Sequence, residues 1–295
     1  MSKSTKRKRG DRKDAVWIRD TDPLHAFMPY LMLDRADNEG VFNGEFDMTA
    51  AMQYLERKNE NSPEFKYTIF HLVMAALSKT IYHRPAMNRF MQGHRLYQRN
   101  DISFSFVVKR VFSDKGEEAL VIMKIDPESD VSPMEQIYNR VKKEVNFVRK
   151  ESGTNGTMNA VGILTKIPRP LLRLAAKILF WLEYHGWVPD ALVKIDPYHT
   201  TCFVSNLGSI KMTASYHHLI NWGTNSIFLV IGEKKWKPFF SQDGSYEMKE
   251  VLPLSFTLDE RIADGFYFAK SIKVLQHILL HPEILDESIQ NPIEF

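Results

Sequence analysis

Helix and strand patterns alternate along most of this 295-residue chain. Apolar residues recur at helical spacing in five segments, several of which begin at a proline or a capping residue: 46–59, 62–84, 132–150, 168–187 and 264–280. Alternating or Phe/Val-rich runs predict five strands: 102–112, 119–125, 200–205, 226–231 and 248–258. Short turns join some neighbouring strands, whereas helices separate others. The pattern therefore predicts an α/β fold, a mixed sheet with helices packed on one face.

The charge distribution divides the chain into two parts. Residues 1–15 hold seven Lys or Arg against two Asp, a balance of +5, whereas the whole chain carries +3. The rest is thus about −2, which argues against a folded nucleic-acid-binding face. We expect 1–15 to be a basic flexible tail, either a solvated arm or a contact for nucleic acid, an anionic membrane or an acidic partner. No Pro-, Gly- or Ser-rich linker interrupts residues 16–295, which predicts a single domain.

Cysteine content and hydropathy indicate in which cellular compartment the chain is expected. The single cysteine, Cys202, lies in an apolar run and excludes an internal disulfide, so we expect a buried thiol in a cytoplasmic protein. No apolar segment of a signal peptide follows the basic start. The most apolar stretch, residues 171–182, contains Arg173 and Lys177 and is shorter than the roughly 20 residues of a spanning helix. It is typical of core or a subunit interface, with a membrane-surface or partner-docking helix as the alternative.

Common catalytic motifs do not occur in the sequence. It contains no glycine-rich phosphate loop, no H-E-x-x-H and no G-x-S-x-G. His217 and His218 are adjacent, but neighbouring side chains point in different directions and make a poor metal pair. We therefore expect no metal site.

Four segments near the C-terminus follow a recognisable order. Residues 201–208 read T-C-F-V-S-N-L-G, 220–223 read I-N-W-G, 227–232 read I-F-L-V-I-G, and 252–265 read L-P-L-S-F-T-L-D-E-R-I-A-D-G. They resemble the T-F-T-I-S-N-L-G, I-I-N-P-P, A-I-L-G-V-G and L-x-L-S-x-S-x-D-H-R-x-x-D-G motifs of the 2-oxoacid dehydrogenase acyltransferase (E2) catalytic domains and the chloramphenicol acetyltransferase-like family. The resemblance is strong after residue 200 and thin before it, and residues 166–190 look like an insertion.

The resemblance implies a fold and a chemistry. The fold would be that of a CoA-dependent acyltransferase, and the reaction would move an acyl group from a coenzyme A thioester to a thiol, hydroxyl or amine, including lipoyl-type acceptors. Ser205 matches the serine that stabilises the oxyanion, and Asp264 matches the aspartate that holds the active-site loop through an arginine, here Arg19 or Arg35. The family's site lies between subunits, which implies a homotrimer or a larger assembly of trimers. The motifs do not indicate the CoA-binding residues.

The chain departs from the family at the catalytic base. Glu260 occupies the position of the family's histidine. Imidazole exchanges protons near neutral pH, whereas a carboxylate is a poor base unless burial raises its pKa, and a general base contributes roughly 10²–10⁴ in rate. Three hypotheses follow. Glu260 is a buried base; His217 or His218 replaces it; or the protein is a catalytically silent trimeric scaffold that binds acyl-CoA or a partner.

A lysine in a tight turn raises the question of lipoylation. Asp114-Lys115-Gly116 is similar to the lipoyl-lysine turn, but a lipoyl domain needs about 80 residues of its own, so we expect a plain hairpin turn and no lipoyl attachment site.

Overall fold

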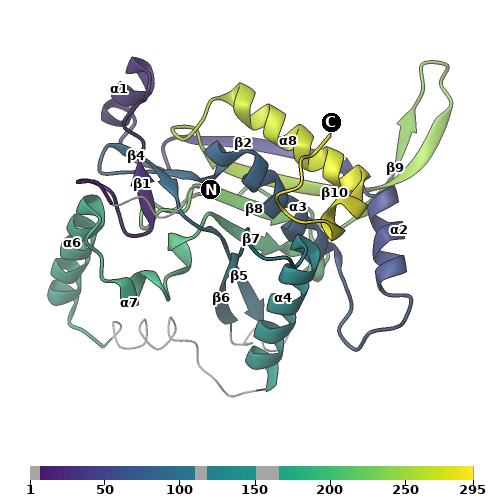
Figure 1. Ribbon diagram of the computed structural model, residues 1–295, viewed down its shortest axis with the longest axis horizontal. Helices are drawn as coiled ribbons and strands as arrows, with labels where there is room; N and C mark the ends of the chain where they lie inside the picture. The colour runs from purple at the N-terminus through teal and green to yellow at the C-terminus, as the bar shows by residue number, and fades with distance from the viewer. Residues whose placement is uncertain (1–6, 110–117, 151–165, 295) are drawn as a thin grey trace.

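The computed structural model describes residues 7–109, 118–150 and 166–294 (Figure 1). Its main sheet has seven strands in the order β2-β10-β8-β7-β5-β6, with β9 paired to β10. The bounds are β2 Glu39–Asp47, β5 Ile102–Lys109, β6 Glu118–Ile125, β7 Cys202–Asn206, β8 Ile227–Ile231, β9 Lys235–Phe240 and β10 Tyr246–Asp259. Neighbours β5, β7 and β8 run parallel, and the other pairs are antiparallel. The sheet is therefore mixed, as the sequence predicts.

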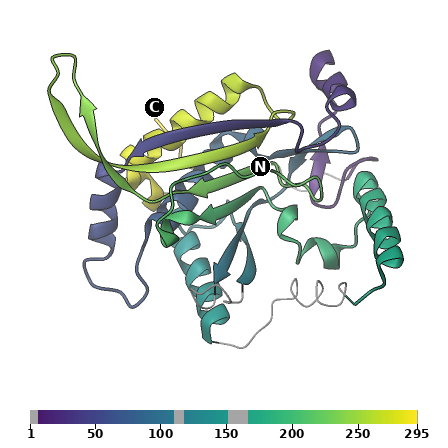
Figure 2. The same ribbon diagram turned by 180° about the vertical axis from the view of Figure 1, so that it is seen from behind.

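Helices cover one face of this sheet. They are α2 Thr49–Lys58, α3 Ile69–His83, α4 Pro133–Lys150 and α8 Gly265–Leu280. Figure 1 shows α3, α4 and α8 in front of the sheet, and Figure 2 shows the opposite side. Alternate strand residues such as Val204 and Leu229 enter the main core with these helices. Their neighbours Phe203, Phe228 and Val230 form a separate cluster on the other face, which we call the open face.

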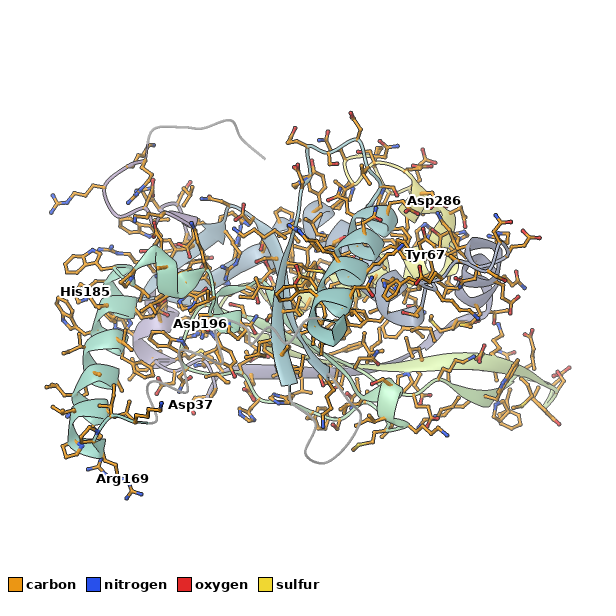
Figure 3. The ribbon with its side chains drawn as sticks, turned by 90° about the horizontal axis from the view of Figure 1, so that it is seen from below. Asp37, Tyr67, Arg169, His185, Asp196 and Asp286 are labelled. Carbon is orange, nitrogen blue, oxygen red and sulfur yellow. The ribbon has the colours of Figure 1, made fainter. Side chains whose placement is uncertain are left out.

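The remaining elements lie beside the main sheet. A three-stranded sheet has the order β1-β4-β3, with β1 Ala15–Trp17, β3 Arg89–Gln92 and β4 Arg95–Arg99. The other helices are α1 Pro23–Leu31, α6 Arg169–His185 and α7 Asp190–Val193. Helix α6 and the β9–β10 hairpin lie at opposite ends of the molecule (Figure 3). None of the helices in the described ranges is both long and apolar enough to cross a bilayer.

Most predicted elements are present, with shifted starts. Helices α4, α6 and α8 and the β5–β6 pair agree with the sequence patterns, while the turn at residues 114–116 lies outside the described residues. Helix α3 starts at Ile69, because a capping box between Thr68 and His71 ends the preceding irregular segment. Helix α2 starts at Thr49, since the residues before it complete β2. Cys202 is buried, and burial raises the pKa of its thiol, as expected for a structural cysteine.

The folded body begins earlier than the basic segment 1–15 suggests. Arg12 is buried and binds Asp14 at 2.9 Å and Glu183 of α6 at 3.3 Å. Asp11 accepts a hydrogen bond from Arg19 at 2.8 Å. Charge composition alone indicates a solvated arm, but Arg12 and Lys13 pair with Glu183 and Asp190, which are far along the chain. The described part of this segment is therefore attached to the body through Arg12.

Candidate active site

Ser205 lies near the end of β7, on the open face. It pairs with Val230 of β8, which pairs in turn with Ser255 of β10, so the three side chains form one row across the sheet. The preceding alternate residue, Phe203, belongs to the open-face cluster, which fixes the direction of Ser205. Ser205 is half-buried, and its hydroxyl group forms no hydrogen bond with any described residue. The hydroxyl is therefore free to donate to a ligand on this face.

A loop that carries the two adjacent histidines covers part of the same face. The His217 ring stacks on Phe228 with ring centroids 3.8 Å apart. Thr257 of β10 donates a hydrogen bond to the His217 carbonyl at 2.5 Å, and the Leu219 amide donates to the carboxylate of Glu39. His217 therefore shares the open face with Ser205 in a single chain. His218 stacks on His217 with centroids 4.8 Å apart, and both rings are exposed.

Glu260 follows the last residue of β10. Its amide donates to the carbonyl of Asn38 at 2.9 Å, and its side chain lies against Gly40 of β2. A Cβ atom at residue 40 would lie only 2.8 Å from Glu260 Oε1, so glycine makes this approach possible. The side chain is exposed and forms no ion pair with a described residue. A single chain does not supply the burial that a carboxylate base requires.

Ser205 and Glu260 are far apart within one chain. The row of Ser205 meets β10 at Ser255, and Glu260 lies five residues further along the same strand direction. At about 3.3 Å per residue, this separates them by roughly 16 Å along the strand, before the lateral distance between strands is added. One chain therefore cannot bring both groups to the same reacting atom.

A buried charge network holds the turn that carries Glu260. Asp259 is fully buried and binds Arg261 through Nε at 2.8 Å and Nη2 at 2.9 Å, with Arg35 Nε at 3.6 Å. Arg35 also donates to the carbonyls of Ile220 at 2.7 Å and Gly223 at 3.0 Å. Burial lowers the pKa of Arg35 to about 10, although the charge of Asp259 opposes the shift. The network connects this turn to residues 220–223, which follow the histidine loop.

Asp264 does not bind an arginine in the way that the family resemblance implies. It is exposed and caps α8, accepting a hydrogen bond from the Tyr267 amide at 2.7 Å. Neither of its two candidate arginines binds it, because Arg19 pairs with Asp11 and Arg35 with Asp259. Sequence reasoning missed Asp259, although its signal was present: it precedes Glu260 directly and ends a buried strand. Glu260 and Asp264 thus lie in the same short connection between β10 and α8, away from Ser205 at the end of β7.

A cavity of about 420 Å³ lies beside Asp264. The walls come from the start of α8, from α1 and the segment before it, and from the turn after α3 with strands β3 and β4, and include Asp22, His25, Arg89 and Tyr267. Arg89 forms no ion pair with a described residue, and burial lowers its pKa. The described residues include no group of three His, Cys, Asp or Glu side chains that could hold a metal.

The comparisons with known proteins agree with this architecture. Residues 194–285 match the model of the 2-oxoacid dehydrogenases acyltransferase (catalytic domain) family. No curated protein matches the chain. A probable dihydrolipoamide acetyltransferase from Listeria monocytogenes is similar in structure, with 14% identity, a TM-score of 0.57 and coverage of 94% of this chain and 97% of that chain.

Two further solved structures have the same fold. A catalytic core of the 2-oxoacid dehydrogenase multienzyme complex from Thermoplasma acidophilum is 15% identical, with a TM-score of 0.54 and coverage of 90% and 98%. A chloramphenicol acetyltransferase is 12% identical, with a TM-score of 0.52 and coverage of 90% and 99%. The predicted fold class is confirmed. The chain has the fold shared by 2-oxoacid dehydrogenase acyltransferase cores and chloramphenicol acetyltransferase, and its residues 194–285 carry the sequence pattern of that acyltransferase catalytic-domain family.

Proposed function

We propose that this protein is a CoA-dependent acyltransferase in which Ser205 stabilises the oxyanion of the transfer. The observation that carries the proposal is the free Ser205 hydroxyl on the open face, inside the segment that matches the acyltransferase family. An acceptor thiol, hydroxyl or amine attacks the thioester carbonyl, and the acceptor's proton passes to a base. The tetrahedral oxyanion accepts a hydrogen bond from Ser205, and its collapse breaks the C–S bond and releases CoA as the thiol.

The distance between Ser205 and Glu260 supports a site made by two subunits. We infer that Glu260 of one subunit faces Ser205 of another, in a homotrimer or a larger assembly. One of the similar structures is described as the cubic core of the pyruvate dehydrogenase multienzyme complex, which accords with assembly. Asp259 fixes the Glu260 turn through Arg35 and Arg261, and Asp264 fixes its other side by capping α8. A subunit boundary would also bury the exposed Glu260 carboxylate and allow it to act as a base.

His217 is the alternative base. It lies on the open face of the same chain as Ser205 and stacks on Phe228, two residues before Val230 on β8. A histidine base at this place would leave Glu260 without a proton-transfer role.

The exposed Glu260 favours a second candidate function. If no subunit buries the carboxylate, the chain lacks a base at the family position and serves as a scaffold that binds acyl-CoA or a partner protein. This function predicts CoA binding without turnover.

The deciding experiment is a thiol-release assay with acetyl-, succinyl- and long-chain acyl-CoA against dihydrolipoamide, alcohols and amines. We expect Ser205→Ala to lower kcat by about 10²–10³, as the loss of one oxyanion donor does. Glu260→Gln should lower it by about 10²–10⁴ if the carboxylate is the base. The exposed pair Ser241→Ala and Glu60→Gln serves as the matched control and should keep full activity.

The same assay separates the alternatives. Activity that survives Glu260→Gln and is lost in His217→Gln assigns the base to His217, with His218→Gln as its neighbour control. If no acceptor supports turnover while calorimetry still detects CoA binding, the scaffold is the correct function. Full activity of Ser205→Ala would contradict the proposal itself.

A further inference from the structure

Helix α6 carries an apolar stripe that the other described residues leave exposed. The stripe consists of four residues at helical spacing, and about half or more of each is exposed: Leu171 57%, Leu174 55%, Ile178 50% and Trp181 53%. At 100° per residue they fall on one side of the helix, nearly opposite the buried Glu183. Figures 1 and 3 show α6 at the outer edge of the molecule, away from the main sheet.

The exposed surface of α6 carries only positive charge. Arg169, Arg173 and Lys177 are exposed and form no ion pair with a described residue. At 100° per residue Lys177 borders the stripe at Trp181, and Arg173 and Arg169 lie progressively further round the helix. The helix has one acidic residue, Glu183, which is turned inward and bound to Arg12 at 3.3 Å and His199 at 2.9 Å. Through Arg12, the basic segment 1–15 is attached at this same end of the molecule.

The C-terminal half of α6 holds the helix to the body. Its ring contacts are Phe180 with Trp222 at 5.4 Å and Tyr184 with His94 at 5.7 Å between centroids. Gly93 lies so close that a Cβ there would be 2.3 Å from the Tyr184 carbonyl oxygen. These contacts and the Glu183 network fix the rotation of the helix. The apolar stripe therefore points away from the body. The Trp181 ring packs edge-on against Trp187, with ring centroids 5.4 Å apart.

Charge distinguishes this face from the other apolar surfaces. Helix α1 also exposes large apolar residues, but it contains no Lys or Arg. The β9–β10 hairpin mixes lysines with Glu247 and Glu250. A second copy placed symmetrically on α6 would bring Arg173 and Lys177 near the same residues of its partner, which is unfavourable. An apolar stripe beside basic residues, with Trp at one end, is complementary to an anionic lipid surface.

We propose that α6 binds the surface of an anionic bilayer. The stripe enters the boundary between headgroups and acyl chains, while Lys177 and Arg173, on the flank of the stripe, bind lipid phosphates. Trp181 and Trp187 lie at headgroup depth, where indole rings are favoured. The basic segment 1–15 adds a second electrostatic contact at the same end. The helix lies on the membrane and does not cross it.

The test is cosedimentation of the full chain with vesicles of phosphatidylcholine alone or mixed with phosphatidylglycerol. We expect binding to the anionic vesicles only, weakening as salt rises. Arg173→Ala with Lys177→Ala should reduce partitioning by about 30-fold, since each basic residue near an anionic surface contributes about 1 kcal/mol. Ile178→Asp should reduce it at least about tenfold through lost apolar burial. The matched controls are Lys66→Ala with Lys273→Ala, and Phe240→Asp in the hairpin at the opposite end, which should bind as the wild type does.

Three outcomes would overturn the proposal. The first is no binding to anionic vesicles. The second is binding that removal of residues 1–13 abolishes but the α6 variants leave unchanged, which assigns it to the tail alone. The third is an assembly that Ile178→Asp dissociates in light scattering, without vesicle binding, which makes the face a contact between copies. Circular dichroism of each variant checks folding. Brominated lipids give an independent measure, because they should quench wild-type fluorescence more than that of Trp181→Phe.

Discussion

Gly40 and Glu260 contact each other at the edge of the main sheet, and the contact gives a test of Glu260 that leaves its carboxylate intact. A Cβ at residue 40 would lie 2.8 Å from Glu260 Oε1 and 2.9 Å from its Cγ. The nearest atoms belong to a flexible side chain, so the backbone can stay in place while the carboxylate moves. A side chain at residue 40 would therefore displace the side chain of Glu260 and leave β2 in place.

We predict that Gly40→Ala lowers acyl transfer severalfold while it changes the free energy of unfolding by less than about 1 kcal/mol. Steady-state kinetics and urea unfolding measure the two effects. In a Glu260→Gln background the same substitution should have little further effect on turnover, because residues that act together are not additive. Equal losses in both backgrounds would show that residue 40 acts through something other than Glu260.

His199 is the residue whose protonation contributes most clearly to the attachment of α6. Its side chain is buried between Glu183, with Nε2 at 2.9 Å from Oε2, and Asp196, with Nδ1 at 3.1 Å from Oδ2. Burial opposes protonation, but the two carboxylates outweigh it and raise the pKa of His199 above its ordinary 6.5. The stabilisation is therefore complete below pH 6.5 and is lost as the pH rises through the raised value.

We predict that His199→Gln lowers the free energy of unfolding by about 3 kcal/mol at pH 6, because it removes the cation between Asp196 and Glu183 and leaves Glu183 with Arg12 alone. The difference from the wild type should shrink as the pH rises toward 9. Urea unfolding across this range is the measurement, with the exposed His281→Gln as control. A difference that stays constant with pH would mean that His199 is neutral in the folded protein.

Helix α3 starts with a titratable cap. The His71 Nδ1 accepts a hydrogen bond from the Thr68 amide at 3.0 Å, and burial alone lowers the pKa of His71 to about 4. The unfolded chain binds a proton near pH 6.5 that the folded helix excludes. Stability is thus present above pH 6.5 and is lost as the pH falls from 6.5 to 4.

We predict that the wild type loses up to about 3 kcal/mol of stability across this acidic range through His71. His71→Gln should lose less, since glutamine also completes a capping box but does not titrate. Acid unfolding followed by circular dichroism measures both, with His185→Gln on the exposed side of α6 as control. Parallel curves for wild type and His71→Gln would exclude His71 as the titrating group.

Elements with strong local patterns could be predicted from the sequence, and elements held by tertiary pairing could not. Helix α8 follows from its apolar spacing and from Asp264 as its cap. Strand β2 has the weak local sequence E-G-V-F-N-G-E-F-D, yet nine of its residues pair with β10. Strands β3 and β4 are short, and a stacked pair, Phe90 and Tyr97 with centroids 5.4 Å apart, joins them. No local pattern shows such partners.

The same distinction between local patterns and tertiary partners applies to the residues of the candidate site. Ser205 could be located, because the strand before it alternates and the motif around it matches a family. The role of Asp259 could not, since a buried aspartate is recognised only by its partners, and Arg35 lies more than 200 residues away in sequence. Motif order placed Asp264 in the correct loop but could not show that Arg19 and Arg35 bind other carboxylates.

The two ends of the molecule differ in the surface that they expose. The α6 end exposes apolar and basic residues, whereas the hairpin end projects the paired strands β9 and β10. Between them, Ser205 at the end of β7 and Glu260 after the end of β10 lie toward opposite edges of the strands, with β8 between the two. A site that uses both groups must therefore be shared between chains, and this sharing can be measured without knowing the symmetry of the assembly.

Subunit complementation is that measurement. The Ser205→Ala chain retains Glu260, and the Glu260→Gln chain retains Ser205, so each is inactive alone if both groups are required. Unfolding and refolding an equal mixture should restore about one quarter of the wild-type activity, because random assembly puts an intact Ser205 and an intact Glu260 at one site in that share of interfaces. Mixing without unfolding should restore less, since subunits then exchange slowly. A mixture of Ser205→Ala with His217→Gln gives the contrast: if the base is His217 of the same chain as Ser205, no site in any hybrid is complete and activity stays at the level of the separate variants. Recovery in the first mixture, together with a His217→Gln chain that is fully active on its own, would identify Glu260 as the group that crosses the subunit boundary.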